Sequence, residues 1–315
     1  MKEKRHYEDI SKAPLLENTK ISSEVAKAII DPLQDKGYPT QYASLNENIG
    51  GLKHGSFIVI GAEQGRGKSI FALNLLLEQC RNGIKSCYVD IENGEPQTWK
   101  RLMMINYQLD SATIMGMTVG KIKKLADGIE NFSYYNESHI ARLVTESKPK
   151  RNVILDLIRQ RIDDGYKVFV IDPFSRFCED DANNELHEEG IFAGHLADLA
   201  REKEICIIAV HHLRKGNQNK RVQEESEIVE SDYAVPTLES FRGSSKIIDR
   251  ATEVIGIIRF PKQTGADIVN MRILKARTGR TGHFFINFDK VTLTFVEPFI
   301  DPIKRLFGEA AEEIT

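Results

Sequence analysis

The chain contains 315 residues, of which 41% are hydrophobic and 28% charged, so it is long enough to bury a substantial core. Its 43 basic and 46 acidic residues give a formal net charge of −3, which excludes a protein whose entire surface attracts nucleic acid. The four cysteines have neither metal-site nor disulfide spacing, no apolar run is long enough to cross a bilayer, and the polar N-terminus resembles no targeting signal. These features predict a cytoplasmic protein without a membrane partner.

Residues 1–36 are predicted to form an N-terminal extension. Ile21, Val25 and Ile29 recur at helical spacing and Asp31-Pro32 ends the run, so we expect a short linker helix at about 21–31. A helix of this length is marginally stable unless its apolar stripe is buried, so it is expected to pack on its own domain or on a neighbouring subunit. The main domain is then expected at 37–300, followed by an acidic tail at 301–315.

A glycine-rich motif follows the first apolar run of the main domain, Phe57–Ile60, and precedes a helical pattern. Gly65 and Gly67 let successive backbone N–H groups turn toward phosphates, and the following helix adds the positive end of its dipole. Lys68 is expected to reach the β- and γ-phosphates, and the Ser69 hydroxyl is expected to hold Mg²⁺. This spacing predicts a nucleotide triphosphatase that uses Mg²⁺ with ATP or another NTP or dNTP. The predicted nucleotide-binding residues are Ala62, Glu63, Gln64, Gly65, Arg66, Gly67, Lys68 and Ser69.

Apolar runs and helical patterns alternate through most of the domain, which predicts an α/β fold with a mostly parallel sheet flanked by helices. Three later runs joined by glycine-containing turns predict antiparallel strands at the C-terminal side of the sheet. The expected parallel strands are Phe57–Ile60, Ser86–Ile91, Val168–Ile171 and Ile205–Val210. The expected helices are Gln97–Tyr107, Arg151–Asp163 and Glu188–Glu202. The expected antiparallel strands are Thr252–Phe260, Ile268–Lys275 and His283–Asp289.

Acidic residues end two of the expected parallel strands, at the edge where ligands bind in such sheets. Asp172 follows Val168–Ile171 and is expected to hold Mg²⁺ or its water shell, with a capping or turn role before Pro173 as the alternative. Asp90 and Glu92 share one face of their strand, and either carboxylate could act as the general base for an attacking water. Glu92 lies nearer the strand end and is favoured.

Histidines and cations end two further strands. His211 and His212 are adjacent and therefore point to opposite faces, so we expect one of them to contact the γ-phosphate rather than both to bind a metal. Lys275 and Arg277 share a face two residues apart near the end of a later strand. Two cations presented together suit phosphate stabilisation, and they suit a solvated edge strand equally well.

A long polar stretch follows the histidines, and four cations cluster with small residues in its front half: Arg214, Lys215, Lys220 and Arg221. Such a loop is suited to contacting the phosphates of single-stranded DNA without reading bases, with an ordinary solvated loop as the alternative. The back half, Glu224–Glu227, would repel DNA, so the expected contact is confined to the four cations.

The order of these motifs resembles the RecA-like motor domain of DnaB-family (superfamily 4) hexameric replicative helicases, and the resemblance runs from about Gly37 to Glu297. The style is closest to phage primase–helicases and Twinkle-type helicases, without their primase module. Alanine at the first position of the phosphate loop, here Ala62, is usual in that family. The segments that carry the resemblance are Ala62–Ser69, Tyr88–Glu92, Val170–Pro173, Val210–Arg214, Phe241–Ser244 and Arg272–Arg277.

The resemblance implies roles that the residues alone leave open. It favours Glu92 over Asp90 as the catalytic glutamate and places γ-phosphate sensing on His212. It makes Arg277, with Lys275 beside it, an arginine finger that enters the nucleotide site of a neighbouring subunit.

The resemblance also implies an assembly and a set of partners. The chain is expected to form a homo-hexameric ring that moves 5′ to 3′ along single-stranded DNA and unwinds duplex, and its small size favours a phage origin. Primase, helicase loader and polymerase would be separate chains. The alternative function is a RecA- or RadA-like recombination ATPase that binds DNA without unwinding it.

Overall fold

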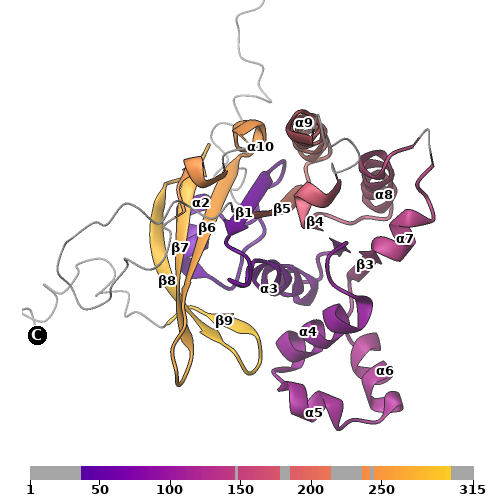
Figure 1. Cartoon of the computed structure of the whole chain (residues 1–315), viewed down its shortest axis with the longest axis vertical. Helices are drawn as coiled ribbons and strands as arrows, with labels where there is room; N and C mark the ends of the chain where they lie inside the picture. The colour runs from indigo at the N-terminus through magenta and orange to yellow at the C-terminus, as the bar shows by residue number, and fades with distance from the viewer. Residues whose placement is uncertain (1–36, 146–147, 178–184, 214–235, 242–244, 299–315) are drawn as a thin grey trace, which may run out of the picture. The chain divides into compact units, whose positions relative to one another are not determined.

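A nine-stranded sheet forms the centre of the domain, with the strand order β3-β2-β4-β5-β1-β6-β7-β8-β9 (Figure 1). The computed structural model describes residues 37–145, 148–177, 185–213, 236–241 and 245–298. The extension at 1–36 with its expected helix and the acidic tail lie outside these ranges. The strands are β1 (Phe57–Ala62), β2 (Ser86–Asp90), β3 (Phe132–Asn136), β4 (Val168–Asp172), β5 (Cys206–His212), β6 (Glu253–Phe260), β7 (Asp267–Ala276), β8 (Gly282–Asp289) and β9 (Thr294–Val296).

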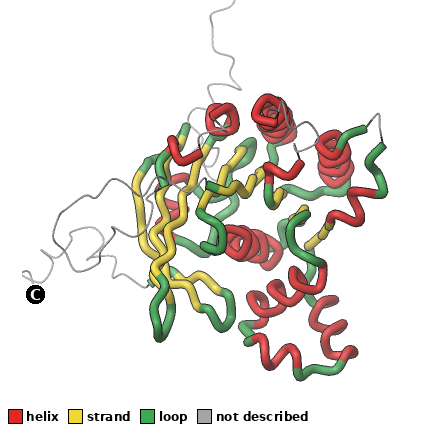
Figure 2. The backbone as a smooth tube through the Cα atoms, in the orientation of Figure 1, coloured by secondary structure: helices red, strands yellow, loops and turns green. Residues whose placement is uncertain are grey.

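Helices connect the strands and cover both faces of the sheet (Figure 2). None of the helices in the described ranges combines the length and apolar character needed to span a membrane. The α-helices are α2 (Ala43–Ile49), α3 (Lys68–Arg81), α4 (Glu95–Tyr107), α5 (Ser111–Met115), α6 (Val119–Asp127), α7 (Glu137–Ala141), α8 (Lys150–Asp163), α9 (Glu185–Lys203) and α10 (Ser245–Arg250). Two 3₁₀ turns lie at η2 (Phe174–Phe177) and η4 (Leu238–Phe241).

Alternating side chains of the strands build two separate cores. On β1, Ile58 and Ile60 join the core beneath α2, α3 and α4, whereas Phe57 and Val59 join the core beneath α8, α9 and α10. Both sets of side chains are buried, so the central strands are apolar on both faces, as expected of parallel strands covered by helices. This confirms the predicted α/β fold with a mostly parallel sheet.

The direction of β6 corrects one expectation. The sequence pattern groups this strand with the antiparallel ones, but it pairs parallel to β1, from Ile58 opposite Glu253 to Gly61 opposite Gly256. The antiparallel part begins on its other edge, where β7, β8 and β9 follow in turn. The physical reason is the long connection from β5, which includes α10. It lets the chain cross back to the end of the sheet where β1 and β5 begin, so that β6 starts there and runs parallel to them.

The strand register defines two opposite edges of the sheet. Ala62 of β1 lies beside His212 of β5, and Asp90 of β2 lies beside Asp172 of β4, so the carboxyl ends of these four strands form one edge. At the opposite edge, Ala276 of β7 pairs with the first residue of β6. The candidate nucleotide site lies at the first of these edges.

Candidate nucleotide-binding site

The loop between β1 and α3 has the backbone geometry of a phosphate cradle. Gly65 and Gly67 adopt φ values of 76° and 96°, a left-handed conformation that favours glycine. Gly67 is the N-cap of α3, and no side chain caps the N–H groups of the first turn. Unsatisfied N–H groups at a helix N-terminus attract anions, so the loop is suited to phosphate.

Lys68, the first residue of α3, is buried with 4% of its surface exposed. Its ammonium donates to the carbonyl oxygen of Glu63 at 3.0 Å, within the same loop. Burial lowers the pKa of Lys68 to about 8, and the carboxylates of Asp172, Glu92 and Glu63 partly oppose this effect. A phosphate placed in the loop would add negative charge beside the buried ammonium and favour its protonated form.

Asp172, the last residue of β4, is completely buried. Its Oδ2 accepts a hydrogen bond from the Tyr88 hydroxyl at 2.5 Å, while its Oδ1 has no hydrogen-bond partner among the described residues. Burial raises the pKa of Asp172 to about 6, against the lowering effect of the nearby Ser69 and Tyr88 hydroxyls. The side chain bonds to β2 and not to the turn at Pro173, so the alternative capping role finds no support in these contacts.

The oxygen atoms of Asp172 and Ser69 fit a magnesium ion. The carboxylate oxygen of Asp172 that has no hydrogen-bond partner within the described ranges and the nearby Ser69 hydroxyl are hard oxygen ligands. Mg²⁺ usually takes one or two such protein ligands together with substrate phosphates. A bound cation would also compensate the burial that now raises the pKa of Asp172.

Glu92 lies two residues beyond β2, and its carboxylate faces the ring of His212 at the end of β5. The His212 Nε2 and Glu92 Oε2 atoms are 3.4 Å apart, and about a third of each side chain is exposed. Burial, followed by the charge of Lys68, lowers the pKa of His212. Asp90, by contrast, is completely buried. Of the two carboxylates that the sequence offered as general base, Glu92 is therefore the one that water can reach.

Lys275 and Arg277 lie at the opposite edge of the sheet from Lys68. The Lys275 ammonium donates to the carbonyl oxygen of Ile248 at 2.6 Å, and the Arg277 guanidinium donates to that of Asp249 at 3.1 Å, so both cations bind the C-terminal end of α10. The two edges are separated by the length of β1, whose six residues span about 17 Å from the first Cα to the last. Within one chain, these cations do not reach the phosphate loop.

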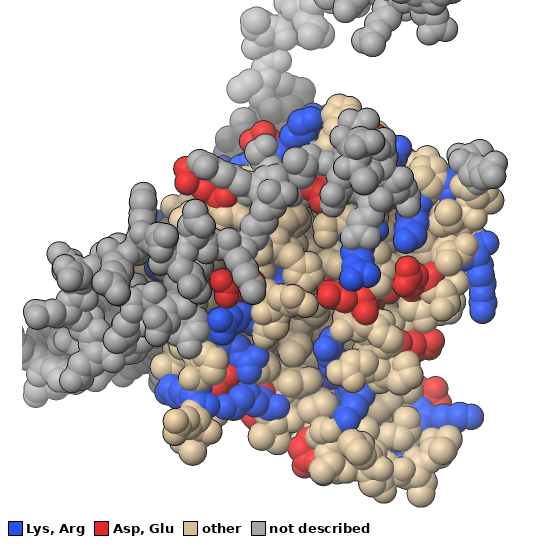
Figure 3. Space-filling view, in the orientation of Figure 1, with Lys and Arg blue, Asp and Glu red and all other residues tan. Residues whose placement is uncertain are grey.

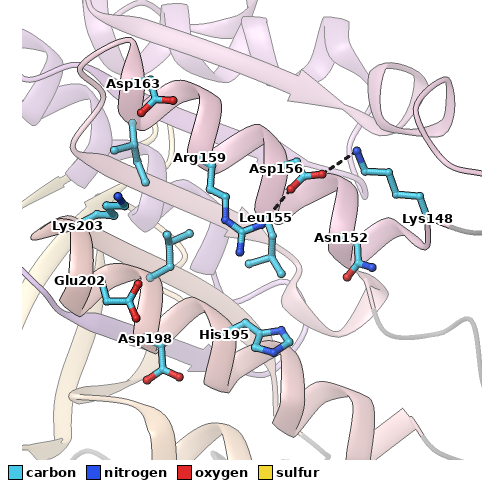
Figure 4. A pocket seen from close by; sticks show the side chains of 12 residues that line it. Lys148, Asn152, Leu155, Asp156, Arg159, Asp163, His195, Asp198, Glu202 and Lys203 are labelled. Carbon is cyan, nitrogen blue, oxygen red and sulfur yellow. Dashed lines mark hydrogen bonds and ion pairs between the residues drawn. The ribbon is translucent and has the colours of Figure 1, made fainter.

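The expected DNA-binding residues Arg214, Lys215, Lys220 and Arg221 lie outside the described residues, as does the segment 242–244 of the late motif. A groove of about 790 Å³ is found elsewhere, between α8 and α9 (Figure 4). Asp156 in this groove pairs with Lys148 at 2.7 Å and with Arg159 at 3.0 Å, so these charges satisfy one another. The groove contains none of the residues at the nucleotide edge of the sheet.

Residues 37–297 match the model of the DnaB-like helicase C-terminal domain. The chain belongs to this family. The match covers the same range as the resemblance seen in the sequence. It spans both edges of the sheet, with the phosphate loop at one and Arg277 at the other.

Individual relatives of this DnaB-like domain agree with the family match. The replicative DNA helicase DnaC of Bacillus subtilis (strain 168) is 23% identical over 289 residues, which are 87% of this chain and 58% of that protein. The chain thus spans a little over half the length of this curated relative. Among solved structures, one described as an ATPase domain has a TM-score of 0.69 at 21% identity, and the match covers 88% of this chain and 95% of that domain. A DnaB-like replicative helicase studied with primase has a TM-score of 0.69 at 20% identity, covering 88% of this chain and 65% of its own.

The sequence did not indicate every residue that shapes the site of this DnaB-like domain. Tyr88, which bonds Asp172, reads as an ordinary apolar strand residue, and only the register of β2 against β4 brings the two together. Gly61 carries a different constraint, because a Cβ there would lie 2.3 Å from the buried ring of Phe241. A strand glycine next to the phosphate loop was the available signal for this close approach.

Proposed function

We propose that this DnaB-like domain is the motor of an NTP-dependent replicative DNA helicase. The supporting observation is the arrangement of Lys68, Asp172 and Glu92 at one edge of the sheet and Arg277 at the other. The first three residues make up a nucleotide site with one buried cation, Lys68. The fourth is a cation at the opposite edge, where it can serve the site of another copy of the chain but not its own.

The residues divide the work of hydrolysis. Lys68 and the N–H groups of the loop bind the β- and γ-phosphates, and Glu92 accepts a proton from the attacking water. Ser69 and Asp172 would hold Mg²⁺, which when bound would supply positive charge to the phosphate oxygens. Arg277 of a neighbouring copy stabilises the charge that spreads over the γ-phosphoryl oxygens, and fingers of this kind typically contribute about 10³–10⁵ in rate.

Around His212, the proposal couples hydrolysis to movement. His212 ends β5 at the nucleotide edge, and the basic segment follows it directly in the sequence. A change at His212 on loss of the γ-phosphate would therefore be passed along the chain to Arg214, Lys215, Lys220 and Arg221, which we assign to contact with single-stranded DNA. On the face shown in Figure 3, Lys and Arg side chains are interspersed with Asp and Glu. A local basic loop therefore suits this chain better than a uniformly basic surface.

The assembly that we propose is a homo-hexameric ring that moves 5′ to 3′ in the cytoplasm, or in the host cytoplasm for a phage-encoded chain. Separate primase, loader and polymerase chains complete the machinery. A relative of known structure is described together with its primase, which supports a primase partner. The alternative of a RecA- or RadA-like ATPase that does not unwind DNA is decided by the strand-separation test below.

Subunit mixing tests the shared site. Arg277→Ala is expected to abolish hydrolysis while leaving nucleotide binding intact, and Lys68→Ala is expected to abolish both. A mixture of the two variants should recover part of the hydrolysis, because the Lys68→Ala copies still present Arg277 to the intact sites of their neighbours. Absence of recovery in mixed assemblies, shown by size to contain both variants, would refute the role of Arg277 in a neighbouring site.

Strand separation tests the helicase assignment. The purified chain is expected to unwind a forked DNA that carries a 5′ tail, in the presence of NTP, and to leave a fork with only a 3′ tail intact. Lys68→Ala is the control for nucleotide dependence. DNA-stimulated hydrolysis without unwinding of either fork would favour the recombination-type ATPase.

A further inference from the structure

The loop that carries Glu92 is held by a buried carboxylate at the end of β2. Oδ1 of Asp90 accepts hydrogen bonds from the backbone N–H groups of Glu92 at 3.0 Å and Asn93 at 2.9 Å, and from the Asn93 side-chain amide at 3.3 Å. Its Oδ2 accepts from the Thr98 hydroxyl at 2.7 Å. Both oxygens of this completely buried side chain are therefore engaged.

These contacts join three elements. Asp90 ends β2, Glu92 and Asn93 form the loop, and Thr98 lies in the first turns of α4. Arg101, further along α4, adds a second connection by donating to the Asn93 side-chain carbonyl at 2.9 Å. The loop is thus attached to the sheet on one side and to the helix on the other, and Asp90 contributes to both attachments.

The side chain of Glu92 has weaker support than its backbone. Its described contact is the one with His212 at 3.4 Å, which is long for a hydrogen bond. The position of the Glu92 carboxylate therefore depends mainly on the backbone from which it projects. That backbone is held by the two N–H groups that donate to Asp90, together with the Ile91 N–H, which donates to the Asp172 carbonyl oxygen at 3.0 Å.

We propose that Asp90 is a positioning residue for the catalytic glutamate. It acts through Glu92: it fixes the backbone of the loop so that the Glu92 carboxylate lies within hydrogen-bond distance of the attacking water. The inference rests on the proposed function, because it takes Glu92 as the general base. Positioning of this kind matters for rate, since a displacement of about 1 Å can cost about 100-fold.

The geometry predicts which substitutions preserve the function. Asp90→Ala removes the acceptor of both loop N–H groups. Asp90→Asn keeps a carbonyl oxygen for them, and its amide can donate to the Thr98 hydroxyl, which is able to accept as well as donate. A positioning role therefore predicts rescue by Asn.

The experiment measures ATP hydrolysis by the full chain. We expect Asp90→Ala to lower kcat by about 10- to 100-fold with KM for ATP changed less than about 2-fold, and Asp90→Asn to stay within about 3-fold of the wild type. Asp110→Ala is the matched control, because Asp110 accepts from the N–H and the hydroxyl of Thr113 at 2.7 and 2.8 Å in a turn away from the site. It should leave both constants unchanged.

A double-mutant cycle separates positioning from a general effect on stability. If Asp90 acts only through Glu92, then Asp90→Ala should cause no further loss of hydrolysis in a Glu92→Gln background. The slow residual hydrolysis in that background is measured by the release of labelled phosphate. A loss of equal size in both backgrounds would overturn the proposal, as would equal impairment by Asn and Ala. Thr98→Val, which removes only the partner of Oδ2, provides a milder second variant and should reduce kcat less than Asp90→Ala with KM unchanged.

The two proposals fail in different ways. Hydrolysis that survives Lys68→Ala would overturn the nucleotide site itself. Hydrolysis that is lost in Lys68→Ala and Glu92→Gln but unaffected in Asp90→Ala would leave the proposed function standing and would overturn the role of Asp90 alone.

Discussion

The buried carboxylate of Asp172 should make the stability of the nucleotide-free protein depend on pH in an unusual direction. Burial raises the pKa of Asp172 from 3.8 to about 6, so between these values the folded chain keeps a proton that the unfolded chain has released. The folded state binds more protons in this window, and its free energy of unfolding therefore falls as the pH rises through it. Most carboxylates in salt bridges act in the opposite direction.

The magnitude follows from the two pKa values. Each pH unit between them corresponds to about 1.4 kcal/mol, so the contribution of Asp172 to the free energy of unfolding should decrease by ~3 kcal/mol between pH 4 and pH 6 and stay constant above. Asp172→Asn removes the titration. The difference in stability between the wild type and this variant should change by that amount across the window, whatever constant offset the substitution itself introduces.

Denaturant unfolding at a series of pH values, in EDTA and without nucleotide, measures this difference. The protein concentration must be low, because the sequence pI of about 6.3 lies close to the window and reduces solubility there. Asp110→Asn is a suitable control, since hydrogen bonds from Thr113 lower the pKa of the exposed Asp110 and its small contribution is lost as the pH falls. Stability curves of wild type and Asp172→Asn that stay parallel from pH 4 to pH 8 would refute the reasoning.

Three further predictions concern neighbouring residues. Tyr88→Phe removes the hydrogen bond that lowers the pKa of Asp172, so this carboxylate should be protonated at a higher pH than in the wild type. As the pH is lowered, Mg²⁺-dependent ADP binding should therefore be lost earlier in the variant, and an unchanged midpoint pH of ADP binding would count against that contact. Because the pKa of Lys68 is lowered to about 8, ADP binding near pH 8 should take up a proton, detectable by calorimetry in buffers of different ionisation enthalpy and absent in Lys68→Arg. Gly61→Ala should cost about 1–3 kcal/mol through its collision with Phe241, and Phe241→Leu should restore part of that loss but destabilise the wild type.

The sequence predicted the central strands because they are buried on both faces. Val168–Ile171 reads as an uninterrupted apolar run, and it forms β4, which extends one residue further, to Asp172. The edge strand β3 was not predicted, because Phe132–Asn136 is short and only half buried, so its composition carries little signal. The short helices α5, α6 and α7 were missed for a similar reason, since short helices depend on tertiary contacts more than on their own residues.

The residues of the candidate site likewise fall into a group that the sequence predicted and a group that it did not. The phosphate loop was predicted because its residues are consecutive and their spacing alone defines the motif. The partners of Asp172 and Asp90 were not, because Tyr88 and Thr98 meet them only through strand register and the packing of α4 on the sheet. Arg277 was expected near a strand end, but the edge on which it lies depends on the direction of β7, which the sequence does not encode locally.

The position of Arg277 opposite the phosphate loop has a consequence for how activity should vary with protein concentration. In the arrangement that we propose, each copy carries two half-sites, one at each edge of its sheet, and an isolated copy has no complete site. A row of copies leaves one half-site unused at each end, and closing the row into a ring turns these two ends into one additional site. Turnover per chain should therefore rise with assembly and reach its maximum only on closure, while nucleotide binding per chain stays constant.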